Sequence, residues 1–214
     1  MDFEKLRKEM VKNQILRRGI KNQKVIEAFL NVPRHLFIPE EFRESSYLDS
    51  PVSIGEGQTI SQPYIVALMT ELLDPKENDK ILEVGTGSGY QAAILSYMGA
   101  KVYSIERIEK LAKRAKEILD LLGYKVNIKI GDGTLGWEEE ALFDKIIVTA
   151  ASPIISPHWK SQVKIGGRIV LPLGESLYQD LVVVNKISES EFRKESICGC
   201  VFVPLIGKYG YKDF

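Results

Sequence analysis

Three glycines at alternate positions have the spacing that most clearly indicates chemistry. Gly85, Gly87 and Gly89 directly follow a short apolar run, residues 81–84. Glycine allows a sharp turn and lets a ligand approach the backbone, and the free N–H groups at the start of a following helix can bind that ligand. A strand that runs into a glycine turn and a helix is the usual construction of a nucleotide-cofactor site. The pattern therefore predicts such a site after residue 84.

The spacing of these glycines favours a cofactor without phosphate groups. The pattern is G-x-G-x-G, with Thr86 and Ser88 between the glycines, whereas dinucleotide enzymes carry G-x-G-x-x-G. A dinucleotide needs its pyrophosphate on the helix end. A cofactor without phosphate needs only room and hydrogen bonds, and we expect residues 85–89 to provide both.

Three carboxylates occur in step with the expected strands. Glu83 lies just before the turn and would suit the amino group or positive charge of a cofactor. Glu106 follows Gly85 by 21 residues, at the end of the next strand, where a carboxylate can accept both ribose hydroxyls. Asp132, with Gly133 behind it, follows the third strand and could hold the exocyclic amine of an adenine. Taken singly, Glu106 could also be a helix N-terminal carboxylate, and Gly131 and Gly133 could be turn residues only. The common register of the glycine turn, Glu106 and Asp132 favours S-adenosylmethionine.

The composition is that of an ordinary globular protein. The chain has 214 residues, 44% of them apolar, and its 29 Lys and Arg balance 29 Asp and Glu. One domain over residues 1–214 is expected, and zero net charge disfavours nucleic acid as a partner. The N-terminus lacks the apolar stretch of a signal peptide, and no run is long enough to span a membrane, so we expect a cytoplasmic monomer. Cys198 and Cys200 are expected to be free thiols, and no metal site is expected.

The first sixty residues predict a helical appendage and a loop. Phe3, Leu6, Met10 and Leu16 recur at helical spacing over residues 2–18, and a second helix is expected between Asn22 and Pro33. Residues 39–58, rich in Ser, Gly, Glu and Pro, are expected to be irregular, and residues 57–64 to form a polar loop over the cofactor site. Pro63 suits the first turn of a helix that ends before Asp74. Ser61 could therefore serve as the N-cap of this helix.

Residues 61–214 predict a Rossmann-like core. Strands and helices alternate, which indicates right-handed βαβ units and a mostly parallel, doubly wound α/β sheet. The last two strands are joined by a polar turn around residues 188–191, which predicts an antiparallel hairpin at the end of the sheet. The seven expected strands are residues 81–84, 101–105, 126–130, 145–149, 168–173, 181–187 and 196–203, and the expected helices between them are residues 91–98, 108–122 and 156–163.

Further short motifs accompany the glycine turn and the acids. They are residues 32–39 (VPRHLFIP), 57–64 (GQTISQPY), 82–90 (LEVGTGSGY), 131–133 (GDG), 148–151 (VTAA), 166–168 (GGR) and 202–205 (FVPL). Together they resemble the protein-L-isoaspartate O-methyltransferase family over nearly the whole chain. The resemblance implies an S-adenosylmethionine-dependent methyltransferase fold. The implied activity is transfer of a methyl group to the α-carboxylate of L-isoaspartyl residues in damaged proteins and peptides.

The resemblance also implies roles for individual residues. Ser61 matches the family's active-site serine, and its hydroxyl could orient the attacking carboxylate. Residues 203–205 match a segment that supports the substrate peptide by backbone contacts, although Val203 and Leu205 could equally be core residues. The residues implied to line the cofactor or substrate cleft are Thr59, Ile60 and Gln62, and those implied to support the peptide are Val203, Pro204 and Leu205.

Other interpretations of the protein's function stay open. One is a methyltransferase that acts on RNA or on a small molecule, but residues 148–151 replace the acid–Pro–Pro–aromatic pattern of amino-methylating enzymes. A second is a cofactor-binding protein without activity, against which the intact loop around Ser61 argues. A third is a nicotinamide oxidoreductase, which the glycine spacing disfavours.

Overall fold

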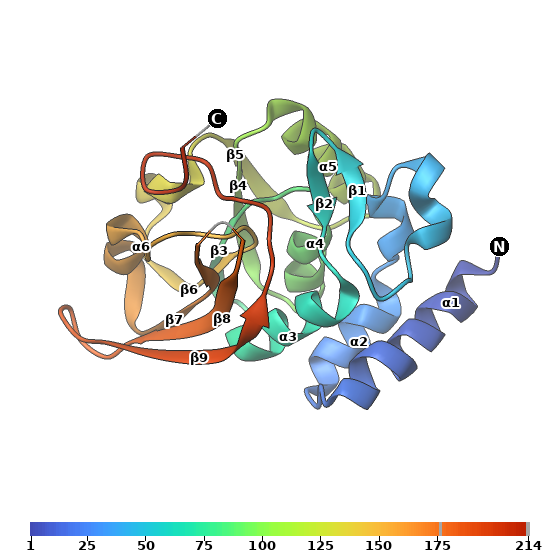
Figure 1. The fold of residues 1–214 in the computed structure, drawn as a ribbon, viewed down its shortest axis with the longest axis horizontal. Coiled ribbons are helices and arrows are strands. Elements are labelled where there is room, and N and C mark those ends of the chain that lie inside the picture. The colour runs from blue at the N-terminus through green and yellow to red at the C-terminus, as the bar shows by residue number, and fades with distance from the viewer. Residues whose placement is uncertain (176, 213–214) are drawn as a thin grey trace.

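A seven-stranded sheet is the centre of the molecule (Figure 1). The computed structural model describes residues 1–175 and 177–212, and the strand order is β5-β4-β3-β6-β7-β8-β9. Strands β5 to β7 of this order are parallel, and the β7-β8 and β8-β9 pairs are antiparallel. The strand bounds are β3 Lys80–Val84, β4 Lys101–Glu106, β5 Val126–Ile130, β6 Phe143–Val148, β7 Val163–Gly174, β8 Gln179–Lys186 and β9 Phe192–Cys200. The predicted Rossmann-like sheet with an antiparallel end is confirmed.

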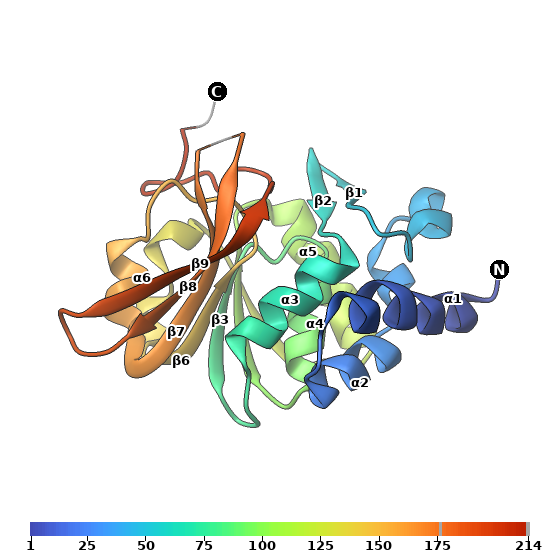
Figure 2. The ribbon, with the colours of Figure 1, turned by 60° about the horizontal axis from the view of Figure 1, so that its bottom comes forward.

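The central strands β3 and β6 are mostly buried and mostly apolar, because helices cover both faces of the sheet. Figure 2 shows α3 and α4 on one side and α6 on the other. Neighbouring residues of β3 accordingly belong to different cores, Ile81 to the core under α3 and α4 and Leu82 to the core under α6. The helix bounds are α3 Pro63–Leu73, α4 Tyr90–Tyr97, α5 Glu109–Leu121 and α6 Pro157–Gln162. Within the described residues, no helix is long and apolar enough to cross a membrane.

The N-terminal segment is helical but is not one continuous α-helix. Helix α1, Phe3–Met10, continues into a π-helical turn, Val11–Ile15, and a 3-10 turn, Leu16–Arg18. The prediction of a regular helix over residues 2–18 was wrong about which residues near its end face the core. Ile15 is fully buried while Leu16, expected on the apolar face, is 46% exposed, because the wider turn shifts the apolar stripe by one residue.

The second helix, α2 Gln23–Asn31, begins as predicted at Asn22, whose side chain accepts hydrogen bonds from two backbone N–H groups. Buried residues of α1, its π-helical continuation and α2 belong to the same core as α3 and α4. The N-terminal helices therefore pack directly against α3 and α4.

Residues 39–58 are more regular than expected. They contain a 3-10 helix, Glu40–Ser45, and the strand β1, Val52–Gly55, which pairs antiparallel with β2, Gln58–Ile60. The side chains of β1 alternate between buried and exposed. Strands of four and three residues are too short for such alternation to stand out in a sequence.

The last strand lies earlier in the chain than predicted. It was expected over residues 196–203 but ends at Cys200, and the turn before it is closed by a bond from Ile187 N to Glu191 O of 2.9 Å. Beyond β9 the chain crosses to the end of β6, where Ala151 exchanges two backbone bonds of 2.8 Å with Val203 and Leu205. Pro204 has no N–H to donate and lies between these two bonds.

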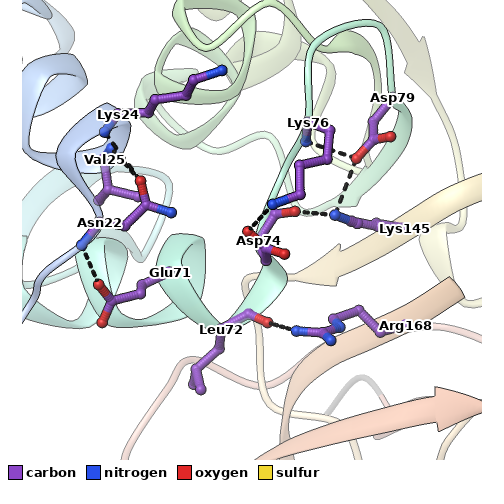
Figure 3. A network of polar contacts seen from close by, with 10 residues as sticks. All are labelled: Asn22, Lys24, Val25, Glu71, Leu72, Asp74, Lys76, Asp79, Lys145 and Arg168. Atoms are coloured by element: carbon purple, nitrogen blue, oxygen red, sulfur yellow. Dashed lines mark hydrogen bonds and ion pairs between the residues drawn. The ribbon is translucent and has the colours of Figure 1, made fainter.

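Polar contacts fix the C-terminal end of α3 (Figure 3). The Glu71 carboxylate accepts bonds of 2.7 Å from the backbone N–H groups of Lys21 and Asn22. Arg168 of β7 donates to Leu72 O at 2.6 Å, and Lys145 of β6 donates to the backbone carbonyl of Asp74, the C-cap of the helix. The network ties the N-terminal segment, α3 and the sheet together at the edge opposite the glycine turn.

Replacing Arg168 by Met should lower the free energy of unfolding by about 1–3 kcal/mol, since it leaves the Leu72 carbonyl without its donor while keeping the apolar stem. Urea unfolding measures the change. Arg193→Met, at an exposed position of β9, is the matched control and should change stability little. Equal stability of the Arg168 variant and wild type would contradict an anchoring role.

Candidate active site

The glycine turn lies at the carboxyl end of β3 and is clamped between its neighbours. Gly85 N donates to Ile105 O at 2.9 Å, and Thr149 Oγ1 donates to Gly85 O at 2.6 Å. Gly85 has a φ of 96°, and a Cβ there would lie 2.6 Å from Thr149 Oγ1. Gly89 caps α4 with a φ of 87°, and a Cβ there would lie 3.2 Å from Leu119. Only glycine satisfies both the backbone conformation and the space.

Two small cavities flank this turn and share Thr59, Gly85, Gly87 and Thr149. The two cavities together form the cofactor cleft, and strand β2 lines both: Gln58 and Thr59 line the first, and Thr59 and Ile60 line the second. The first, of about 80 Å³, is lined by Gln58, Thr59, Val84, Gly85, Gly87, Ile105, Glu106, Arg107, Ile108, Gly133, Thr149, Ala150 and residues 203–206. The second, of about 40 Å³, is lined by Thr59, Ile60, Ser61, Val66, Met69, Glu83, residues 85–88, Tyr90, Gln91 and Thr149.

Glu106 lines the first cavity, as its predicted role requires. Its two carboxylate oxygens accept bonds from Gly87 N at 2.8 Å and Ile108 N at 2.9 Å. The side chain therefore holds the glycine turn and the start of α5 together. Each oxygen keeps a further lone pair for a ligand hydroxyl.

Glu83 lines the second cavity and is fully buried. Its Oε2 accepts a bond from Ser104 Oγ, which also bonds Thr86 Oγ1 at 2.6 Å, while its Oε1 has no partner among the described residues. Burial raises the pKa of Glu83 to about 8, and the nearby charge of Glu106 raises it further against the lowering by Ser104. An unpartnered buried carboxylate oxygen fits a ligand that brings a cationic group.

Asp132 is directed away from the cleft. Its Oδ1 accepts bonds from Thr134 N and Oγ1 at 2.8 and 2.7 Å, and its Oδ2 accepts one from Lys208 N at 2.8 Å. Gly133, and not Asp132, lines the first cavity. The spacing of Asp132 and Thr134 is typical of a local turn and was the sequence signal for these hydrogen bonds. A contact of Asp132 with an adenine amine stays a prediction.

Ser61 lies in the extended link between β2 and α3. The N-cap of α3 is Gln62, without a side-chain bond, so the predicted capping role of Ser61 was wrong. The Ser61 hydroxyl has no hydrogen-bond partner in the described part of the chain. It faces the second cavity and also a larger groove of about 700 Å³.

The groove runs between α3 and the end of β9. Thr59, Ser61 and Thr149 line both it and the cofactor cleft, so three hydroxyl groups lie where the two meet. Thr149 was not predicted as a site residue, although its place at the end of a central strand was a signal. The other groove residues are Arg18, Pro51, Gln62, Tyr64, Ile65 and residues 198–203.

The two cysteines and residues 203–205 also lie at this junction. Cys198 and Cys200 are free and half-buried, as predicted, and burial raises the pKa of Cys200 to about 12. Val203 lines both the groove and the first cavity, and Pro204 and Leu205 line the cavity. The carbonyl of Val203 accepts from Ala151 N, and the N–H of Leu205 donates to Ala151 O. The Leu205 N–H is therefore not free for a substrate, whereas the Val203 carbonyl keeps a further lone pair.

Comparison with known proteins identifies the family. Residues 4–210 match the family model for protein-L-isoaspartate(D-aspartate) O-methyltransferase. The chain belongs to this family. It is 52% identical to the Geobacter metallireducens protein-L-isoaspartate O-methyltransferase, with 99% of this chain and 98% of the relative aligned. It is 54% identical to that of Syntrophus aciditrophicus, with 98% of this chain and 97% of the relative aligned.

Solved structures of protein-L-isoaspartate O-methyltransferases share the fold. One superimposes with a TM-score of 0.84 at 28% identity, over 95% of this chain and 67% of its own. A Plasmodium falciparum structure described as a member of the family superimposes with a TM-score of 0.80 at 27% identity, over 93% of this chain and 97% of its own. The Plasmodium protein is in complex with S-adenosyl-L-homocysteine.

The Glu83→Gln variant of this methyltransferase should have an altered dependence of stability on pH. The folded pKa of Glu83, about 8, is raised above the ordinary value of 4.5. Its stabilising contribution is therefore full below about pH 4.5 and is lost as pH rises to 8. A neutral glutamine removes this loss, so the melting temperature of the variant relative to wild type should rise from pH 5 to pH 9.

Thermal unfolding at pH 5, 7 and 9 without ligand measures this difference. Glu195→Gln, at an exposed position of β9, is the control and should show a constant difference. A constant difference for the Glu83 variant would contradict burial of an acid with a raised pKa.

Proposed function

We propose that this chain transfers a methyl group from S-adenosylmethionine to the α-carboxylate of L-isoaspartyl residues in damaged proteins and peptides. The observation that carries the proposal is the Ser61 hydroxyl, which has no protein partner in the described residues and lies where the cofactor cleft meets the groove. Membership of the family supports the choice of substrate.

The cleft offers a distinct group for each part of the cofactor. Glu83 would accept the ammonium group, and Glu106 the ribose hydroxyls. The glycine turn would let the nucleoside approach the backbone closely, because glycine has no side chain to block it. When bound, S-adenosylmethionine supplies a methyl group on a cationic sulfur that leaves readily. The other residues proposed to bind it are Thr59, Ile60, Gln62, Gly85, Thr86, Gly87, Ser88, Gly89, Asp132 and Gly133.

The chain needs neither a general base nor a general acid for this transfer. A carboxylate with an ordinary pKa near ~4 is ionised at neutral pH and is itself the nucleophile. The two histidines lie elsewhere: His35 bonds the Tyr47 hydroxyl at 2.8 Å, and the ring of His158 lies 5.3 Å from that of Tyr209. The remaining task is to align the carboxylate and exclude water, a proximity effect worth roughly 7–11 kcal/mol. Ser61 would donate its O–H to one carboxylate oxygen and leave the other to attack.

The groove would hold the damaged polypeptide. Strand β9 ends the sheet, so its outer edge carries unpaired main-chain groups that an extended peptide can bind. Val203, Pro204 and Leu205 would form the wall that holds the peptide next to the cofactor. We also propose that the chain acts as a single-domain monomer in the cytoplasm, without a nucleic-acid partner, which its balanced charge supports.

The Ser61→Ala variant should methylate an isoaspartyl peptide about 10- to 100-fold more slowly, because a hydrogen bond to a charged group is lost. The dissociation constant of the cofactor should stay within about twofold. Labelled-methyl transfer to peptides with isoaspartate or aspartate, together with calorimetry, measures both quantities. Ser190→Ala, in the exposed β8-β9 turn, should behave as wild type. Equal losses in transfer and cofactor affinity would refute the orienting role.

The Glu106→Ala variant should bind S-adenosylmethionine at least about tenfold more weakly, since charge-assisted bonds of roughly 1.5–3 kcal/mol each are lost. Part of this loss comes from the turn itself, because Gly87 N loses its acceptor. Calorimetric titration at a temperature where the variant is folded measures the affinity. An unchanged dissociation constant would place the ribose site elsewhere.

A further inference from the structure

The groove beside Ser61 contains one charged side chain. Of the residues that line it, Arg18 alone is ionised at neutral pH; the others are hydroxyl, amide, thiol, aromatic, aliphatic or glycine residues. Arg18 lines only the groove, whereas Thr59, Ser61 and Thr149 also line the cofactor cleft. Arg18 thus contacts the part of the groove that lies away from the reacting methyl group.

The position of Arg18 is fixed from two sides. It ends a 3-10 turn at Gly19, which has a φ of 94°. Its guanidinium carbon lies 3.6 Å from the centroid of the Tyr64 ring on α3. Its Nη1 donates to Asp49 Oδ2 at 3.0 Å, and the two side chains are 42% and 38% exposed. A stacked guanidinium keeps its N–H donors at its rim, and the other donors of Arg18 have no protein partner among the described residues.

We propose that Arg18 is a specificity-determining residue, which binds the carboxylate of an acidic residue flanking the isoaspartyl residue of the substrate. The inference rests on the proposed function and names the polypeptide sequences that this site prefers. A guanidinium offers paired N–H donors that match a carboxylate. The largely uncharged walls of the groove provide no competing cation.

Asp49 sets the strength of this preference. In the free protein its carboxylate occupies part of the guanidinium and offsets its charge. Gln62, the neighbour of Ser61, donates to the Asp49 carbonyl at 3.1 Å, which holds Asp49 beside the loop. A substrate carboxylate must share Arg18 with Asp49 or displace it, so removing the charge of Asp49 should strengthen the preference for acidic substrates.

A purely structural role for Arg18 makes a different prediction. The ion pair and the ring contact join the N-terminal segment to α3, and their loss would lower activity towards every peptide by the same factor. Selectivity among peptides would not change. The ratio of kcat/KM for two peptides, measured with one variant, therefore separates the specificity role of Arg18 from a purely structural role.

The experiment uses sets of isoaspartyl peptides. Within a set the peptides differ at one flanking position, which carries Glu, Gln or Lys, and different sets place this position before or after the isoaspartyl residue. We expect wild type to prefer Glu over Gln by about two- to fivefold in kcat/KM at one or more positions, the range for a partly exposed ion pair. Arg18→Gln should bring this ratio close to one, Arg18→Lys should keep part of it, and Asp49→Asn should raise it. Arg17→Gln changes the neighbouring exposed arginine, which does not line the groove, and should keep the wild-type ratio.

The dissociation constants of the same peptides are measured in the presence of S-adenosyl-L-homocysteine, and their ratios are compared in the same way. If wild type methylates none of the peptides, the proposed function fails, while the binding ratios still decide the role of Arg18. A wild-type ratio of one at every position, or an unchanged ratio in Arg18→Gln, would overturn the inference. A ratio that falls as salt is added would support it.

Discussion

The packing of the glycine turn against β4 and β6 is the constraint on which the site depends. Gly85 is held by Ile105 on one side and Thr149 on the other, with no room for a Cβ. This clamp sets where α4 begins and where Gly87 meets the Glu106 carboxylate. A shift of the turn would therefore move the cofactor cleft and the hydroxyl group of Thr149 together.

The buried Glu83 carboxyl carries a free-energy cost in the protein without ligand. An acid with a pKa near 8 and one unpartnered oxygen opposes folding at neutral pH. A cationic ligand would supply the missing partner and offset the penalty. The β1-β2 hairpin beside the two cavities of the cleft turns at Gly55 and Gly57, which have φ of 84° and 68°.

The sequence predicted the sheet well because its central strands, β3 and β6, contain short apolar runs that are covered on both faces. It predicted the glycine turn, Glu83 and Glu106 because strand ends in a parallel sheet meet at one edge. It could not show the distant contact in which Lys208 N, far along the chain, donates to Asp132 Oδ2. It also failed where elements are short, as in the hairpin of residues 52–60, or where one π-helical turn shifts the apolar phase, as at Ile15.

The cofactor cleft and the groove share some of their walls. The ends of β3, β4 and β6 form the glycine-turn side of the cleft, whereas helix α3 and the segment after β9 line both the cleft and the groove, and Arg18 lines the groove. Helix α3 is in turn held at its far end by Glu71 and Arg168. A substitution in the N-terminal segment can therefore change which polypeptides fit the groove without moving the glycine turn. Thr59, Ser61, Thr149 and Val203 line both sites, so their positions link the cofactor cleft to the groove.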